Sequence, residues 1–162
     1  MGEDYEKVSE EVYPPPPSGA GADPNARWLA ERIIQGSVQL YTSAEPRLAH
    51  RFALAQTSLS WHFTDAEPLG FTLLLDRAPV EVLTQPRSDS EIDIYLTAQQ
   101  LLDVYTGRSH LTMEIARGNI TYEGTVRKFL ALVPLHKRLD FRVMGAIARE
   151  YKEHMANGQS AR

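Results

Sequence analysis

The stretch over residues 91–124 constrains the fold most, because two different hydrophobic periods follow one another in it. Apolar and polar side chains alternate over residues 92–96, which is the period of a strand with one buried face. Thr97 and Gln100 then form the T-x-x-Q pattern of a capping box, where a helix is expected to begin. Gly107 stands where a left-handed residue commonly ends a helix. The stretch therefore predicts a strand that leads directly into a helix.

The segment after this helix fits two structures. Leu111, Met113 and Ile115 alternate like the apolar residues of a strand. Leu111 and Ile115 are also one helical turn apart, and Gly118 could end such a helix. The pattern alone leaves the choice between strand and helix open.

A G-x-apolar-x-apolar-x-G run, GNITYEG over residues 118–124, precedes a leucine-rich segment that resumes a helical period at Thr125. Together with the strand and the capped helix before it, this order resembles the sterol carrier protein, or non-specific lipid-transfer, family. The resemblance covers residues 46–139. Its motifs are apolar and glycine positions without an invariant catalytic residue, so it implies a fold more than an activity. It also implies a helix over residues 109–116.

The whole chain is expected to form one α+β domain between two tails. Residues 1–24 combine acidic residues with prolines and have almost nothing to bury, so a disordered tail is expected there. The domain is expected over residues 25–156, with an extra N-terminal helix over 25–42 outside the resemblance. Apolar strands joined by short hairpins, with helices before and after them, predict a mostly antiparallel five-stranded sheet covered by helices, similar to sterol carrier proteins. Residues 157–162 are expected to be a second disordered tail.

Composition excludes several classes of function. The net charge of −4 is concentrated in residues 1–24, which sum to −5, so the rest of the chain sums to +1 and offers no field for nucleic-acid phosphates. The absence of cysteine removes disulfides, thiol nucleophiles and zinc–thiolate sites. No apolar run approaches the roughly 20 residues of a membrane span, and the acidic N-terminus is unlike a signal peptide. We therefore expect a cytoplasmic protein that binds no nucleic acid and does not insert stably into a membrane.

The sequence carries no recognisable catalytic or cofactor motif. It lacks the nucleophile elbow, the phosphate-binding loop and the dinucleotide glycine pattern, and its five histidines are not spaced for a metal site. We therefore expect no metal, no cofactor and, on balance, no enzyme activity. The candidates for acid or base chemistry are His62 in a strand and Asp76 at a strand end. Their ordinary interpretation is a half-exposed strand histidine and a turn carboxylate.

Large apolar residues on the expected strands and on three helical faces are the most prominent feature of the chain. Taken alone, they indicate an ordinary close-packed core. In the sterol carrier family, however, the space between the sheet and the helices is a tunnel for a fatty or sterol-like molecule, so the resemblance implies an apolar cavity. Strand parity and helix stripes select the expected lining, which is Phe71, Leu73, Leu75, Ile94, Leu102, Tyr105, Met113, Phe129, Leu132 and Met144.

The favoured function is therefore the non-covalent binding or transfer of an apolar small molecule, such as a lipid, a sterol-like molecule or a polyketide- or terpenoid-like molecule. One alternative is a structural or interaction module, as a homodimer or an enzyme-partner subunit, with Trp28 or the helix over 141–155 as its contact. Another is a small biosynthetic enzyme that uses the apolar pocket.

Overall fold

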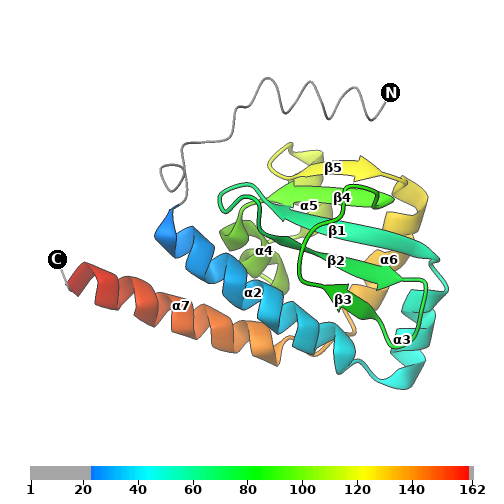
Figure 1. The fold of residues 1–162 in the computed structure, drawn as a ribbon, viewed down its shortest axis with the longest axis horizontal. Coiled ribbons are helices and arrows are strands. Elements are labelled where there is room, and N and C mark those ends of the chain that lie inside the picture. Colours follow the sequence, from blue (N-terminus) through cyan, green and yellow to red (C-terminus); the bar gives the residue numbers. More distant parts are fainter. Residues whose placement is uncertain (1–22, 161–162) are drawn as a thin grey trace.

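The fold consists of a five-stranded sheet with helices packed on one of its faces (Figure 1). The computed structural model describes residues 23–160, so residues 1–22 of the tail expected over 1–24, and the last two residues, lie outside it. Within that range the elements in chain order are α2 (Pro24–Thr42), α3 (Pro46–Ala53), β1 (Thr57–Phe63), β2 (Gly70–Leu75), β3 (Glu81–Leu83), β4 (Ile92–Leu96), α4 (Ala98–Tyr105), α5 (Leu111–Ala116), β5 (Thr121–Gly124), α6 (Val126–His136) and α7 (Arg142–Ser160).

The sheet is mixed, which corrects the expectation of a mostly antiparallel sheet. Its strand order is β3-β2-β1-β4-β5, and β1 pairs with β4 in parallel while the other neighbouring strands are antiparallel. Hairpin reasoning joins only strands that are consecutive in the chain. It therefore does not foresee that the chain returns after β3 to the free edge of β1 and runs in the same direction.

The crossover over residues 84–91 makes this return across the face of the sheet opposite to the helices (Figure 1). Two buried hydroxyl residues of that face, Ser60 and Thr72, hold the crossover. The Arg87 N–H donates to both hydroxyl oxygens, at 3.2 Å and 3.1 Å, and the Thr72 hydroxyl donates to the Gln85 carbonyl at 2.9 Å. Polar residues are therefore buried on this face because the crossover satisfies their hydrogen bonds.

The helix-covered face of the sheet carries the apolar residues that strand alternation predicts. The pairing register places Leu59, Trp61 and Ile94 on this same face. The fully or almost fully buried side chains contributed by β1, β2 and β4 are Leu59, Trp61, Phe63, Phe71, Leu73, Leu75, Ile92, Ile94 and Leu96.

The capping box predicted at the start of α4 is confirmed. Thr97 Oγ1 accepts from the Gln100 N–H at 3.1 Å, and Gln100 Oε1 accepts from the Thr97 N–H at 2.8 Å. The segment after α4 is the helix α5, so the helical structure implied by the resemblance is correct. Gly107 lies two residues after the end of α4, with a φ of +80°, and Gly118 lies two residues after the end of α5, with a φ of +81°.

The helix α2, which corresponds to the extra helix expected over 25–42, packs antiparallel on α7 (Figure 1). Its cap is Asp23, whose carboxylate accepts from the Asn25 N–H at 2.9 Å, so the helix begins at Pro24, one residue before the expected start. Gly36 is buried inside α2, where a Cβ would come within 3.3 Å of the Met144 methyl group. The missing side chain therefore lets α7 approach α2 closely.

The C-terminal helix α7 is longer than expected. It continues to Ser160 instead of ending at residues 157–158, which corrects the boundary of the expected tail. Gly158 is not among the glycines that adopt the positive φ with which a helix terminates. No helix within residues 23–160 is long and apolar enough to cross a membrane.

We predict that Gly124→Ala destabilises the protein by about 3 kcal/mol or more, because φ at Gly124 is +131° and a Cβ would lie 2.9 Å from the Ile92 Cα and still closer to the Glu91 carbonyl oxygen. Gly118→Ala is the matched control, since its φ is also positive but the space around it is open. It is expected to cost about 1 kcal/mol. Urea unfolding measures both values, and equal losses would contradict the close approach of β5 to β4.

Candidate functional site

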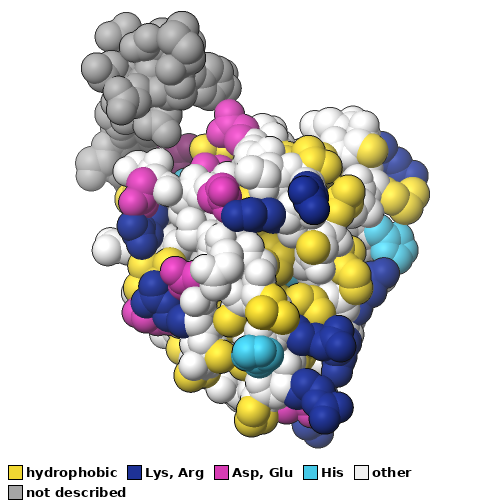
Figure 2. All heavy atoms as spheres, turned by 90° about the vertical axis from the view of Figure 1, so that its right-hand side faces the viewer, with side chains coloured by type: hydrophobic (Ala, Val, Ile, Leu, Met, Phe, Trp, Pro, Cys, Tyr) yellow, Lys and Arg dark blue, Asp and Glu magenta, His cyan; other side chains and the backbone are white. Residues whose placement is uncertain are grey.

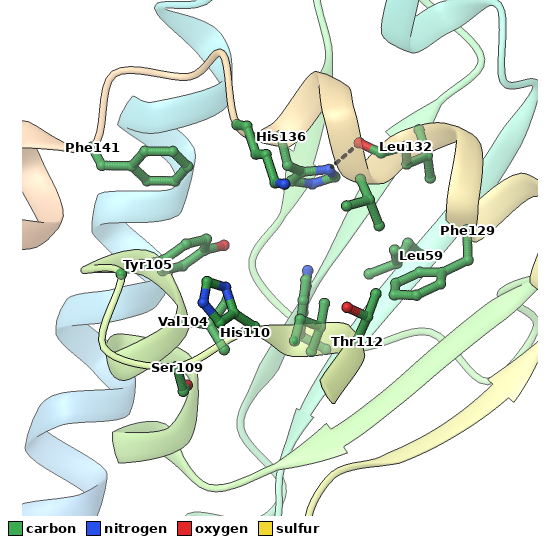
Figure 3. Close-up of a pocket in the computed structure, with 15 residues that line it drawn as sticks. Leu59, Val104, Tyr105, Ser109, His110, Thr112, Phe129, Leu132, His136 and Phe141 are labelled. Carbon is green, nitrogen blue, oxygen red and sulfur yellow. Dashed lines mark hydrogen bonds between the residues drawn. The ribbon is translucent and has the colours of Figure 1, made fainter. Parts of the chain in front are cut away.

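A pocket of about 350 Å³ lies between β1, the end of α4, the start of α5 and α6 (Figure 3). The surface of its walls is mostly apolar. The residues that line it are Leu59, Trp61, Val104, Tyr105, Gly107, Ser109, His110, Leu111, Thr112, Phe129, Leu132, Val133, His136, Lys137 and Phe141.

The helix α6 contributes one wall through residues spaced as a single helical face. Phe129, Leu132, Val133 and His136 follow one another at i, i+3, i+4 and i+7, which brings them onto one side of the helix. The alternation of β1 brings Leu59 and Trp61 to the same space from the sheet. The site is thus assembled from two periodic patterns that face one another.

The mouth of the pocket is more polar than its walls. His110 and Thr112, at the start of α5, and Lys137, directly after α6, line the pocket and are exposed to solvent. A ligand that enters here passes basic side chains before it reaches the apolar interior.

The ring of His136 is an uncharged part of the wall. Its Nδ1 lies 3.0 Å from the Leu132 carbonyl oxygen, and because a carbonyl only accepts, Nδ1 carries the proton and Nε2 presents a lone pair. Burial of the ring lowers the pKa of His136 to about 4, so the ring is neutral near pH 7. Since the ring ordinarily titrates near 6.5, acidification from pH 6.5 towards 4 favours the unfolded chain.

Several polar atoms in and behind the pocket lack a hydrogen-bond partner. Among the described residues, no partner is found for the buried Trp61 Nε1 and His136 Nε2. The buried hydroxyls of Ser37, Tyr41 and Tyr105 lie beside one another, within reach of long hydrogen bonds among themselves. Burial raises the pKa of Tyr105 to about 12 and that of Tyr41 above its ordinary value, so both phenols stay protonated.

Three of the ten predicted lining residues, Tyr105, Phe129 and Leu132, lie in the pocket. Six others are buried in the core but do not line it, namely Phe71, Leu73, Leu75, Ile94, Leu102 and Met144. Met113 is 46% exposed, because only part of the short helix α5 can face the pocket. The structure therefore brings together the expected lining residues of α6 and Tyr105 at the end of α4, but not Leu102 of the same helix.

Sequence reasoning missed His136 and the residues at the mouth. The ring of His136 packs edge-on against Tyr41 and Phe52, at ring distances of 5.5 Å and 5.1 Å. The signal that could have found it is its position seven residues after Phe129, on the same stripe of α6.

The two candidates for acid or base chemistry lie away from the pocket. His62 alternates with Trp61 and so projects from the opposite face of the sheet, where its Nε2 lies 2.8 Å from Asp93 Oδ1 and its ring stacks on Tyr95. Asp76 is exposed after β2 and pairs with Arg77 at 2.8 Å. The pair therefore does not form a catalytic constellation with the pocket.

A metal site was not expected, and within residues 23–160 no group of three or more histidine, aspartate or glutamate side chains is placed to hold a metal ion.

A second hollow lies between α3 and α6, on the other side of Leu132 from the pocket. The residues that line it are Arg47, His50, Arg51, Leu54, Ala55, Ala131, Leu132 and Leu135. Figure 2 faces this side of the molecule and shows Lys and Arg side chains next to hydrophobic ones. Leu54, directly after α3, is 68% exposed, and Val126 and Leu130 on α6 are 58% and 53% exposed.

Trp28, which was considered as a partner-binding anchor, packs on its own chain. Its ring stacks on His154 at 4.3 Å and on Tyr151 at 6.0 Å, and the Arg32 guanidinium lies 5.1 Å from its centre. These contacts join α2 to α7, so this face of Trp28 is already occupied.

No protein-family model and no curated protein sequence matches the chain. Among solved structures, the chain is similar to sterol carrier protein domain 2 of Helicoverpa armigera, with a TM-score of 0.56 and 10% identity over 78% of this chain and 96% of that one. It is similar to sterol carrier protein 2 from Yarrowia lipolytica, with a TM-score of 0.50 and 17% identity over 67% and 87%. It also matches the sec-alkylsulfatase Pisa1 from Pseudomonas sp., with a TM-score of 0.46 and 19% identity over 57% of this chain, and spans only 14% of that protein's length. The resemblance expected from residues 91–124 is therefore confirmed for the fold, and the chain has the fold of sterol carrier protein 2.

Proposed function

We propose that this protein binds an apolar small molecule, of the size of a fatty chain or a small ring system, in the pocket between β1, α4, α5 and α6. The observation that carries the proposal is the pocket itself, because about 350 Å³ of space remains between mostly apolar walls in an otherwise buried core. This volume lies at the small end of the range usual for ligand sites. Two of the structures with a similar fold are sterol carrier proteins, which agrees with a ligand of this class.

The energy of such binding is sufficient for a carrier. Each buried methylene contributes about 0.8 kcal/mol, so eight to ten enclosed carbons contribute roughly 6–8 kcal/mol before ordering costs, which corresponds to roughly micromolar affinity. The walls contribute no buried charge, since His136 is neutral, and the interaction is therefore dispersive and hydrophobic over most of the ligand.

We further propose that the side of the molecule with α3 and α6 touches anionic lipid surfaces when the ligand is transferred. Charge complementarity supports this, because Arg47, His50 and Arg51 line the hollow beside the exposed apolar residues. Among the described residues, Arg47 and Arg51 have no acidic partner within ion-pair distance, so their charges are available to phosphate groups. The helix α6 also forms a wall of the pocket, so a ligand bound there would lie next to this surface.

We predict that Val133→Trp lowers the affinity for an environment-sensitive fatty probe at least about ten-fold, because Val133 is half-buried in the pocket wall and the larger ring occupies the space of the ligand. Leu130→Trp is the matched control on the same helix, since Leu130 is 53% exposed and does not line the pocket. Fluorescence titration measures both affinities.

Organic extraction and mass spectrometry of the purified protein complete this test. We expect an apolar compound in the wild type and less of it in Val133→Trp. A wild-type protein with no extracted compound and no saturable probe binding would rule out the carrier function, because the pocket would then hold no ligand.

We predict that the double variant Arg47→Glu/Arg51→Glu lowers the binding constant for phosphatidylglycerol-containing vesicles about 30-fold or more, since each cation lost near the surface costs roughly 1 kcal/mol. Co-sedimentation with the vesicles measures this constant. The control is Arg27→Glu/Lys152→Glu, which makes the same change of charge at exposed positions of α2 and α7. Equal losses in the two double variants would show that only net charge matters and would remove the proposed lipid-facing side.

A further inference from the structure

Apolar walls alone do not account for the polar atoms that the pocket contains. Tyr105, Trp61 and His136 all line it. The buried Trp61 Nε1 and His136 Nε2 have no partner among the described residues, and the Tyr105 hydroxyl has only the hydroxyls of Ser37 and Tyr41 beside it. Figure 3 shows the Tyr105 hydroxyl directed from α4 towards the middle of the pocket, and the His136 ring reaching into the same space from α6. Buried polar atoms are nearly always satisfied in folded proteins, so two unpaired atoms and a third that is only loosely paired around one space indicate a missing partner in that space.

The three groups differ in what they offer to a ligand. The Trp61 Nε1–H only donates, and the His136 Nε2 only accepts, because Nδ1 carries the proton that points at the Leu132 carbonyl. The Tyr105 hydroxyl can do either. A ligand group that both donates and accepts, as an alcohol does, can pair with this set, and a ketone can pair with its donors.

These polar groups are uncharged, which limits the charge of the ligand group. Tyr105 and Trp61 are neutral side chains, and His136 is neutral near pH 7 because burial lowers its pKa. A buried carboxylate without a cationic partner is strongly unfavourable. The basic side chains His110 and Lys137 are exposed at the mouth, where water already solvates them.

We propose that the pocket selects an apolar molecule with a neutral hydroxyl or carbonyl group, which pairs with Tyr105, His136 and Trp61, over a molecule of the same length that ends in a carboxylate. The proposal rests on the proposed function, because it specifies the ligand class of the same pocket. The alternative is a fatty acid whose carboxylate stays at the mouth beside Lys137.

The test is a displacement titration of the fluorescent fatty probe at pH 8 with 1-dodecanol, 2-dodecanone, dodecanoate and dodecane. We expect dodecanol to bind about ten-fold or more tightly than either dodecane or dodecanoate, since it gains at least one hydrogen bond to a buried group that is otherwise unpaired. Dodecanone is expected to bind more tightly than dodecane.

The variant Tyr105→Phe removes the hydroxyl and keeps the ring. It is expected to reduce the ratio of dodecanol to dodecane affinity about five-fold, because the hydroxyl that pairs with the ligand is lost, while the ligand-free protein keeps a cooperative melting transition since the ring stays in the wall. Tyr151→Phe, on α7 outside the pocket, is the control and should leave both readouts unchanged.

The outcomes separate this proposal from the proposed function. Saturable probe binding with equal displacement by dodecanol and dodecane overturns the proposal and leaves the carrier function intact. Tighter binding of dodecanoate that Lys137→Gln abolishes also overturns it, in favour of a carboxylate at the mouth. Absence of saturable probe binding contradicts the proposed function itself.

Discussion

The parallel pairing of β1 with β4 is the constraint on which the pocket depends. Parallel neighbours need a crossover, and here it passes over the face of the sheet that carries Ser60 and Thr72. The hydroxyls of these residues hydrogen-bond to the crossover, so that face is closed by a short polar segment. The opposite face, with Leu59 and Trp61, is left to the helices. The pocket forms there because α6 and the end of α4 approach β1 from separate directions without filling the space between them (Figure 3).

The interior of the pocket combines an apolar wall with polar atoms that carry no charge. This combination follows from burial, which keeps His136 neutral and both Tyr41 and Tyr105 protonated. A charged group in the same position would need a buried counter-ion, and none of the lining residues inside the mouth offers one. Selectivity in such a site comes from the pairing of donors and acceptors, while the affinity comes from the apolar area that is removed from water.

The parts of the fold that local signals decide were predictable from the sequence. The capping box at Thr97 is such a signal, since its two hydrogen bonds lie within four residues of chain. The direction of β4 was not predictable, because it depends on a crossover of which the sequence shows only polar loop residues.

Strand parity selects the correct face of the sheet, but it does not say which strand a given helix covers. The helix α2 packs against β2 and β3, so Phe71, Leu73 and Leu75 became core, and the pocket formed over β1 instead. A strand and a helix over residues 111–116 direct the Met113 side chain to different sides. Its position could therefore be predicted only once α5 was known to be a helix.

The antiparallel packing of α2 on α7 has a consequence for how the molecule can be held. Asn25 and His154 are hydrogen-bonded at 3.1 Å, so the first turn of α2 and the last turns of α7 are adjacent (Figure 1). The hollow between α3 and α6 lies at the opposite end of the molecule. A surface tether, an affinity tag or another folded unit attached at either end of the described chain would thus hold the protein at the end opposite this hollow. The end that carries the cationic groups and the exposed leucines would remain free to face outwards.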